Sequence, residues 1–343
     1  EGYDDGEISV TTVGDGVLEF VLSAPCAYME DLMAFPSFFP VKRDAVEGAS
    51  GPDGYPGAWC SEAGFVSNGA FICESWEHDD TITYVKNPYY YDADSVRVEK
   101  LVYVLSEDIE TTGAAFLSGE LDFLDDYYHE TAVKAEADGT GTEVIYTTLG
   151  TYYLSVNARS ALFDGMTPAQ AACAREAISI LIDRAAICDM LGLPEEAVAD
   201  GFIPDSMSDG SCGFFENSHF DPYAISADHE KTLMRARQLL IASGLELGKD
   251  GRLAQPVTLT YLFNDSPYHG MIAGSVAESL AEIGIVVETG SLSWNEFQDA
   301  RTAGGFDIVR GGWIADFNDP INMLEMFTSY SGNNDCFLGM AMS

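Results

Sequence analysis

The amino-acid sequence predicts an α/β fold with partly parallel sheets, and three observations support this. Short β-like stretches alternate with stretches of helical periodicity, most regularly in the second half of the chain. Thr167-Pro168 begins a stretch in which apolar residues recur at helical spacing up to Ala185. The 343 residues are 47% apolar and 21% charged, which suits two domains or one large two-lobed domain with a real core.

The first half of the chain is expected to hold mainly β-structure. The polar turn at residues 77–80 joins two β-like stretches, and the Gly- and Pro-rich residues 48–57 predict a loop. Gly119 marks the end of a predicted helix. The expected strands are 17–22, 70–76, 81–86, 98–104, 121–124 and 143–148, and the expected helices are 107–118 and a charged stretch up to about residue 137.

The second half is expected to alternate strands with helices. Thr167 supplies an N-cap hydroxyl and Pro168 a favoured first-turn residue, so a helix is predicted to begin there. Gly244 is the expected C-terminal cap of a later helix. The expected strands are 152–156, 257–263, 285–288 and 306–309, and the further helices are 226–244, 271–283 and 294–303.

The chain is strongly acidic, with 16 Lys plus Arg against 56 Asp plus Glu and a formal net charge of −40. Nucleic-acid binding is excluded because phosphate contacts need a basic face. A self-repelling acidic surface is the favoured interpretation, with attraction of cationic solutes as the weaker alternative. The longest apolar run, residues 177–182, is too short to span a membrane. Residues 1–30 show no signal-peptide pattern, so an exported form would already have lost its signal.

Motifs of catalysis and metal binding are missing, so we predict a protein that is not an enzyme and carries no cofactor. The seven cysteines form no CxxC pair, and buried thiols are favoured over the alternative of a Cys60–Cys73 disulfide. A cluster of acidic residues and one histidine runs from Asp122 to Glu130. In so acidic a chain we interpret it as a solvated face rather than a metal site.

Several segments, in order along the chain, resemble the peptide-binding family of ABC-transporter substrate-binding proteins. The motif that starts at Ser67-Asn68-Gly69 and runs through Trp76 to Asn87-Pro88 is similar to one of that family, although Tyr91 stands where the family usually has Trp. The further matching segments are Gly119-Glu120-Leu121-Asp122, 152–157, Phe163-Asp164, Arg175-Glu176-Ala177, Ile182-Asp183-Arg184 and, most specifically, 306–320.

This resemblance implies a two-lobed fold like that of the class II periplasmic binding proteins. Family members extend further at both ends, so the chain is expected to be a fragment. Residues 1–150 would form an incomplete first lobe, and residues 151–343 the second lobe, truncated at its C-terminal end. The crossing from one lobe to the other is expected near residues 147–151.

The resemblance also implies ligand-binding residues. Asp316 matches the carboxylate that pairs with the free α-amine of a bound peptide, with capping of the bend at 318–320 as the alternative. Trp313 and Ile314 match positions whose backbone pairs with the ligand in β-strand fashion, although core packing explains Trp313 equally well.

Four further residues match positions near the ligand. Arg310 would either orient Asp316 or form a structural salt bridge. Arg301 would meet a ligand carboxylate, but a surface ion pair is slightly favoured. Asn264 and His269 match cleft positions that follow the strand 257–263.

The function implied is capture of peptides in an interlobe cleft for uptake by an ABC transporter. The implied partners are a peptide ligand, a membrane permease and an ATPase. The implied location is the periplasm or cell surface, with a lipid anchor on the full-length protein. The alternatives are a binder of another solute (nickel chelate, haem or oligosaccharide) and a peptide-sensing receptor or chaperone on the same fold. A hydrolase is a more distant alternative, and it would need a nucleophile–base pair near Asp316.

Overall fold

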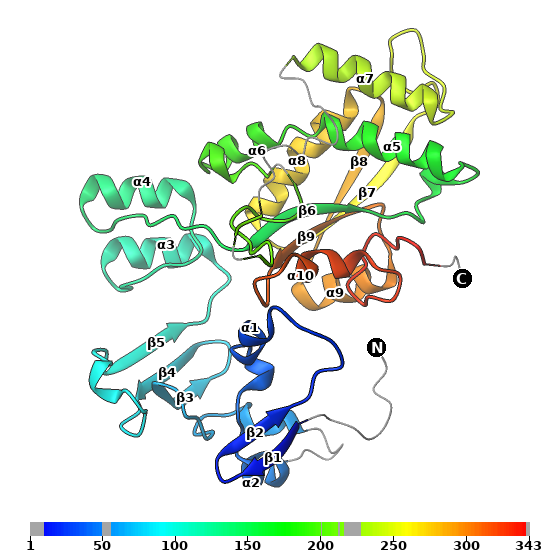
Figure 1. The fold of residues 1–343 in the computed structure, drawn as a ribbon. Helices are drawn as coiled ribbons and strands as arrows, with labels where there is room; N and C mark the ends of the chain where they lie inside the picture. The colour runs from blue at the N-terminus through cyan, green and yellow to red at the C-terminus, as the bar shows by residue number, and fades with distance from the viewer. Residues whose placement is uncertain (1–9, 50–55, 200, 212, 216–227, 341–343) are drawn as a thin grey trace. The chain divides into compact units, whose positions relative to one another are not determined.

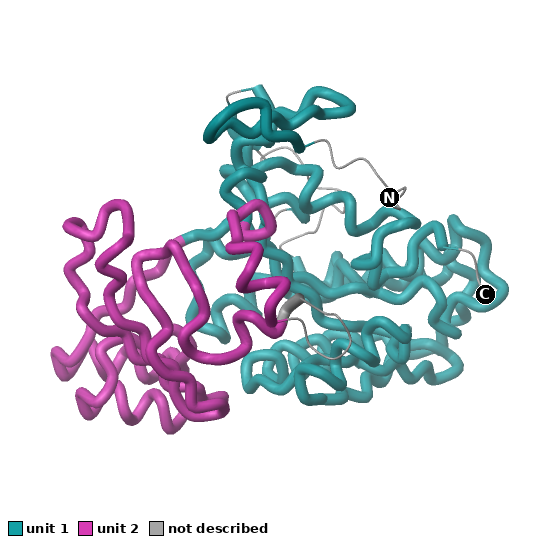
Figure 2. Tube along the Cα trace, turned by 90° about the horizontal axis from the view of Figure 1, so that it is seen from below, with its two compact units in different colours: residues 1–35, 147–343 teal, residues 36–146 magenta. Residues whose placement is uncertain are grey.

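The computed structural model describes residues 10–49, 56–199, 201–211, 213–215 and 228–340. The chain divides into two compact units, coloured separately in Figure 2. Unit 1 comprises residues 1–35 and 147–343, and unit 2 comprises residues 36–146. The assignment of lobes to residues 1–150 and 151–343 stays a prediction.

Unit 2 is built on a small antiparallel sheet, which confirms the hairpin predicted around residues 77–80. Strand β4 lies between β3 and β5, and Ile82 pairs with both Trp76 and Tyr103. An apolar hollow of about 350 Å³ lies over one face and is lined by side chains that include Phe71 and Tyr84. The elements of unit 2 are η1 (Pro36–Phe38), α2 (Arg43–Gly48), η2 (Pro56–Cys60), β3 (Phe71–Glu77), β4 (Thr81–Lys86), η3 (Ala93–Ser95), β5 (Lys100–Val104), α3 (Ile109–Ser118) and α4 (His129–Asp138).

Unit 1 contains a four-stranded sheet in the order β6-β9-β7-β8. β7 runs parallel to β8 and β9, whereas β6 runs antiparallel to β9, so the sheet is partly parallel as predicted. The elements of unit 1 are β1 (Val10–Gly14), β2 (Val17–Phe20), α1 (Met29–Met33), β6 (Gly150–Val156), η4 (Ala161–Phe163), α5 (Pro168–Leu181), α6 (Arg184–Met190), η5 (Glu195–Ala197), α7 (His229–Ala242), β7 (Val257–Asn264), α8 (Pro267–Ala281), β8 (Ile285–Leu292), α9 (Trp294–Ala303), β9 (Ile308–Ile314), α10 (Pro320–Leu324) and η6 (Glu325–Phe327).

Helices cover both faces of this sheet. Successive strand residues point to opposite faces, and here both sets are apolar, so each face needs a covering layer. On one face Tyr261 and Ile308 join the main core, which α5, α7 and α8 complete. On the other face Leu262 and Val309 pack with Phe297 of α9. Figure 1 shows α5, α7 and α8 on the side of the sheet opposite α9. The α/β layering follows from this alternation.

Local signals place several helix ends. Thr167 and Gln170 form the capping box at the start of α5, as the Thr167-Pro168 pair predicts. Gly244 has a left-handed backbone, and its N–H donates to the carbonyl of Ile241. The N–H of Leu245 donates to the carbonyl of Leu240, and the two bonds together form a Schellman motif after Ser243. The predicted start of that helix at residue 226 lies outside the described residues, as do residues 50–55 of the predicted 48–57 loop.

Two predicted strands are wrong. Residues 121–124 form bends and irregular backbone, and Phe123 is exposed. Residues 143–148 have no strand partner either, and Val144 and Tyr146 are about three-quarters exposed. Both stretches have β-forming side chains, but a strand also needs a neighbouring backbone to pair with. The strand expected at 306–309 begins later, at Ile308, and runs on to Ile314.

Candidate ligand site

The free edge of β9 is the centre of the candidate site. β9 pairs with β6 along its whole length, from Val156↔Ile308 to Gly150↔Ile314. It pairs with β7 only at Ile308 and Val309. Beyond Val309, therefore, no described strand lies against the second side of β9. Unpaired backbone groups of this kind bind an added extended chain.

Trp313 and Asp316 are tied to one buried side chain, that of Asn322. Asn322 lies on α10 and is 1% exposed. Its Oδ1 accepts a hydrogen bond from the Trp313 indole Nε1 at 2.9 Å and another from the Asp316 backbone N at 3.0 Å. The Asp316 residue itself is exposed. The backbone of Asp316 is thus fixed, and its carboxylate remains accessible.

The loop between β9 and α10 is held at several further points. The Asp319 carboxylate caps α10 by accepting from the backbone N of Ile321 at 2.9 Å. Asn318 Oδ1 accepts from Ser208 N at 2.7 Å. The ring of Phe317 stacks on Tyr28 with centroids 4.4 Å apart. The capping role that was the alternative for Asp316 belongs, in this structure, to Asp319.

Arg310 is held by an amide and two aromatic rings. Its Nε donates to Asn264 Oδ1 at 2.7 Å, and its Nη2 donates to the same oxygen. The guanidinium carbon lies 5.7 Å from the Trp294 ring centroid and 5.4 Å from that of Phe297. Burial lowers the pKa of Arg310 from its ordinary value. No ion pair joins Arg310 to Asp316 among the described residues, and neither of the two roles expected for Arg310 appears in this geometry.

His269 lies near the same arginine. Its Nδ1 is 3.3 Å from the Tyr152 hydroxyl, and the two ring centroids are 5.6 Å apart. Burial, and secondly the positive charge of Arg310, lower the pKa of His269 to about 4. His269 is therefore neutral at physiological pH and serves as a hydrogen-bonding group rather than as a cation.

Arg301 contacts the C-terminal segment of the described chain. Its Nε lies 3.5 Å from Asp335 Oδ1, and both side chains are largely buried. Its guanidinium also lies over the Phe297 ring, 5.8 Å from the centroid. Burial raises the pKa of Asp335, and the charge of Arg301 partly opposes this shift. The ion pair expected for Arg301 is present, in a more buried position than a surface pair.

The cysteines and the possible metal ligands of the described residues form no further site. Cys60 and Cys73 are thiols, so the alternative disulfide between them is wrong in this structure. Within the described ranges, no group of three or more His, Cys, Asp or Glu side chains has metal-binding geometry, including the stretch from Asp122 to Glu130. Across the same residues, no helix is both long and apolar enough to cross a membrane.

Asn322 is the site residue that the sequence analysis missed. The pattern Ile321-Asn322-Met323 carried a signal, because it puts an amide in an apolar stretch just after a helix start. A polar side chain there either faces solvent or satisfies buried donors, and only the fold decides which.

Comparisons with known proteins identify the family. The sequence profile of the bacterial extracellular solute-binding proteins, family 5 (middle region), matches residues 2–335. The oligopeptide-binding protein OppA of Bacillus subtilis is 28% identical over 339 residues, which are 96% of this chain and 57% of that protein. The periplasmic murein peptide-binding protein MppA of Escherichia coli is 28% identical over 330 residues, which are 95% of this chain and 56% of that protein.

The solved structure of the Escherichia coli murein tripeptide-binding protein MppA superposes with a TM-score of 0.77 at 27% identity, covering 96% of this chain and 60% of that one. The chain therefore spans less than two thirds of the length of these relatives. The predicted two-lobed α/β fold is confirmed by this likeness. Since the family profile matches nearly the whole chain, the protein belongs to the bacterial extracellular solute-binding proteins, family 5.

Proposed function

We propose that the protein is the substrate-binding component of an ABC transporter and captures peptides outside the cytoplasm for uptake. The family consists of solute-binding proteins, and the relatives OppA and MppA are named for oligopeptide and murein-peptide binding. The partners are then a peptide, a membrane permease and its ATPase. The protein would hold and release its ligand without changing it.

One observation carries this proposal, namely that the free edge of β9 leads to an exposed carboxylate with a fixed backbone. The edge begins beyond Val309, and Asp316 follows its end by two residues. An extended peptide adds to such an edge through main-chain hydrogen bonds, which tolerate many side chains. A peptide also brings an ammonium group at its N-terminus. Asp316 supplies the opposite charge for a charge-assisted hydrogen bond at that end.

The other predicted residues would serve the peptide in supporting ways. Ile314 is 69% exposed and offers apolar contact at the end of the strand. Arg310 and His269 present polar groups, and Asn264 holds Arg310 in place. Catalysis is not part of the proposal. In the described structure, Arg310 donates to Asn264 and Trp313 donates to Asn322, while the His269 ring lies beside the Tyr152 hydroxyl. None of these bonds involves a serine or cysteine nucleophile.

A cycle of one mutation and one ligand modification tests the proposal. Asp316→Asn keeps the shape of the side chain but removes its charge. Leaving one partner of a desolvated charge pair unmatched costs roughly 2–5 kcal/mol, which is about 30-fold or more in affinity. N-acetylation of a tri- to pentapeptide should cause a similar loss in the wild type and little further loss in Asp316→Asn. Calorimetric titration of the intact protein measures all four combinations.

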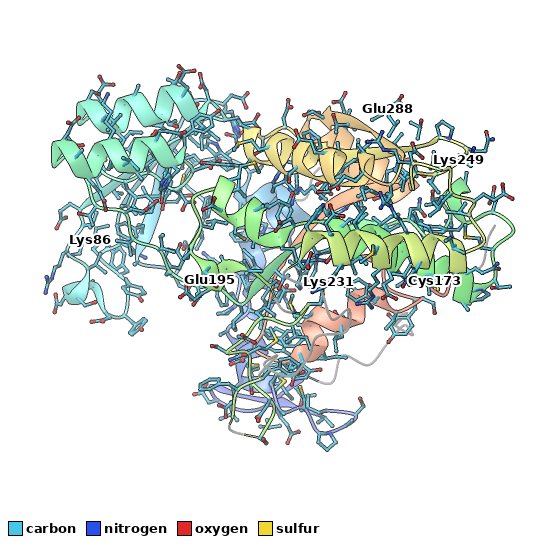
Figure 3. All side chains as sticks on the ribbon, turned by 90° about the horizontal axis from the view of Figure 1, so that it is seen from above. Lys86, Cys173, Glu195, Lys231, Lys249 and Glu288 are labelled. Atoms are coloured by element: carbon cyan, nitrogen blue, oxygen red, sulfur yellow. The ribbon has the colours of Figure 1, made fainter. Side chains whose placement is uncertain are left out.

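A matched control removes a carboxylate elsewhere. Glu288 is an exposed residue of β8 and is labelled in Figure 3. Glu288→Gln makes the same change to the net charge of −40 but should leave peptide affinity unaltered. Absence of saturable peptide binding in the wild type would contradict peptide capture. Losses that simply add across the cycle would remove Asp316 from the amine site.

A further inference from the structure

We infer that Asn322 is a positioning residue that gives the site its preference for ligands with a free amine. This inference rests on the proposed function. The argument starts from one atom, because a single amide oxygen of Asn322 accepts both the Trp313 indole N–H and the Asp316 backbone N–H. The two candidate ligand residues are thereby linked through a third residue that need not touch the ligand.

The anchor is itself well fixed. Asn322 lies on α10, which begins at Pro320 and is capped by Asp319. Its side chain is almost completely buried, and the next residue, Met323, is fully buried. A buried side chain occupies one rotamer, so the position of Oδ1 is set by the packing of α10.

This arrangement fixes the backbone from which the Asp316 carboxylate projects. An exposed loop aspartate would otherwise lose conformational freedom when a ligand binds, and that loss weakens binding. Here the Asp316 backbone N–H and the Trp313 ring are held at 3.0 Å and 2.9 Å from the same oxygen before any ligand arrives. The backbone that carries the carboxylate is therefore preorganised for an ammonium group, and a ligand without that group gains little from it.

The experiment measures amine selectivity, which is the ratio of affinities for a free peptide and its N-acetylated form. Asn322→Leu keeps the approximate volume of the side chain but removes the acceptor. We expect affinity for the free peptide to fall about tenfold, as for the loss of one well-placed hydrogen bond. Affinity for the acetylated peptide should change by less than about threefold. The amine selectivity therefore falls, which a purely structural role would not cause.

Three further variants complete the test. Asn322→Asp keeps an acceptor oxygen in either protonation state and should retain the selectivity of the wild type. Asn334→Leu is the matched control, because Asn334 is another buried amide of unit 1 and bonds Thr328 and Leu338 instead. It should lower stability and leave the selectivity unchanged. Asn322→Ser, whose short hydroxyl cannot serve both donors, replaces the leucine variant if that variant does not fold.

The outcomes separate this inference from the proposed function. If the wild type binds the free peptide more tightly than the acetylated one, and Asn322→Leu binds with the same ratio, the positioning role is refuted and peptide capture stands. If Asn334→Leu changes the ratio as much as Asn322→Leu, general loosening of the fold explains both, and the inference is overturned. If the wild type binds no peptide, the proposed function fails first.

Discussion

The contact between Arg310 and Asn264 offers a quantitative test of the site in its ligand-free form. Two guanidinium nitrogens donate to one amide oxygen across a sequence separation of 46 residues. Arg310→Met and Asn264→Ala each remove one side of this contact, and the double variant removes both. The free energy of unfolding of the four proteins then isolates the contact itself.

The expected magnitude follows from the groups involved. A hydrogen bond to a charged donor contributes about 1.5–3 kcal/mol. Because both nitrogens share one oxygen, we count a single contact and expect a coupling energy of about 1.5 kcal/mol. The stacking of Arg310 on Trp294 and Phe297 adds roughly 0.5–1 kcal/mol per ring. That contribution belongs to Arg310 alone, so it cancels in the cycle and only enlarges the loss in Arg310→Met.

Urea unfolding at 25 °C, followed by far-UV circular dichroism, gives the four free energies. Coupling below about 0.5 kcal/mol would mean that the two mutations act independently. Asn264 would then not be what holds Arg310, and the site would need another anchor for its buried cation.

Two further predictions concern stability. Leu280→Ala removes a fully buried core side chain of α8 and should lower the free energy of unfolding by about 2–5 kcal/mol. Ile241→Ala, on the exposed face of α7, should change it by no more than about 0.5 kcal/mol, and similar losses in a urea titration would contradict the assigned core. A hydrogen bond to Glu282 raises the pKa of His229. The stabilisation by this pair is therefore fully present below the unfolded-state pKa of 6.5 and is lost as pH rises through the folded-state pKa. The melting temperatures of wild type and His229→Asn should differ more at pH 5.5 than at pH 8.5, and an equal difference at both would rule the contribution out.

Surface ion pairs, by contrast, are expected to contribute little. Lys231 of α7, labelled in Figure 3, lies 3.1 Å from Asp228 with its side chain 67% exposed. Solvent and salt screen such a pair, and ordering two long side chains costs entropy. The excess acidic residues are a separate matter. Their net charge is expected to affect solubility and self-repulsion rather than the choice of fold.

The elements that sequence alone predicted well are those with signals at both ends. The helix Trp294–Ala303 was predicted with its observed bounds. It begins at the capping box of Ser293 and Glu296, and Gly304 ends it in a left-handed conformation. β4 was likewise bounded by a polar turn and by Asn87-Pro88. Local chemistry was enough to predict these elements.

The failures lie where a distant partner decides. Residues 143–148 have the composition of a strand, yet the described structure gives them no backbone to pair with. The expected contact of Arg310 with Asp316 joined neighbours in sequence, but the fold brings Asn264 closer. The role of Asn322 depends on α10 turning back toward β9, which no local pattern encodes. Motif matching supplied the candidate site residues, but it did not predict the contacts that hold them.

The pairing of β6 with β9 also bears on how the protein is made. β7, α8 and β8 follow one another closely, whereas β6 leaves the ribosome roughly 150 residues before its partner β9. At about 5–20 residues per second, that interval is on the order of 8–30 s. Throughout this time the central sheet of unit 1 cannot be completed, since its strand order places β9 between β6 and β7. In this family member, therefore, the central sheet can close only after nearly all of the present sequence has been synthesised, and an unfinished chain is kept from folding into its final form.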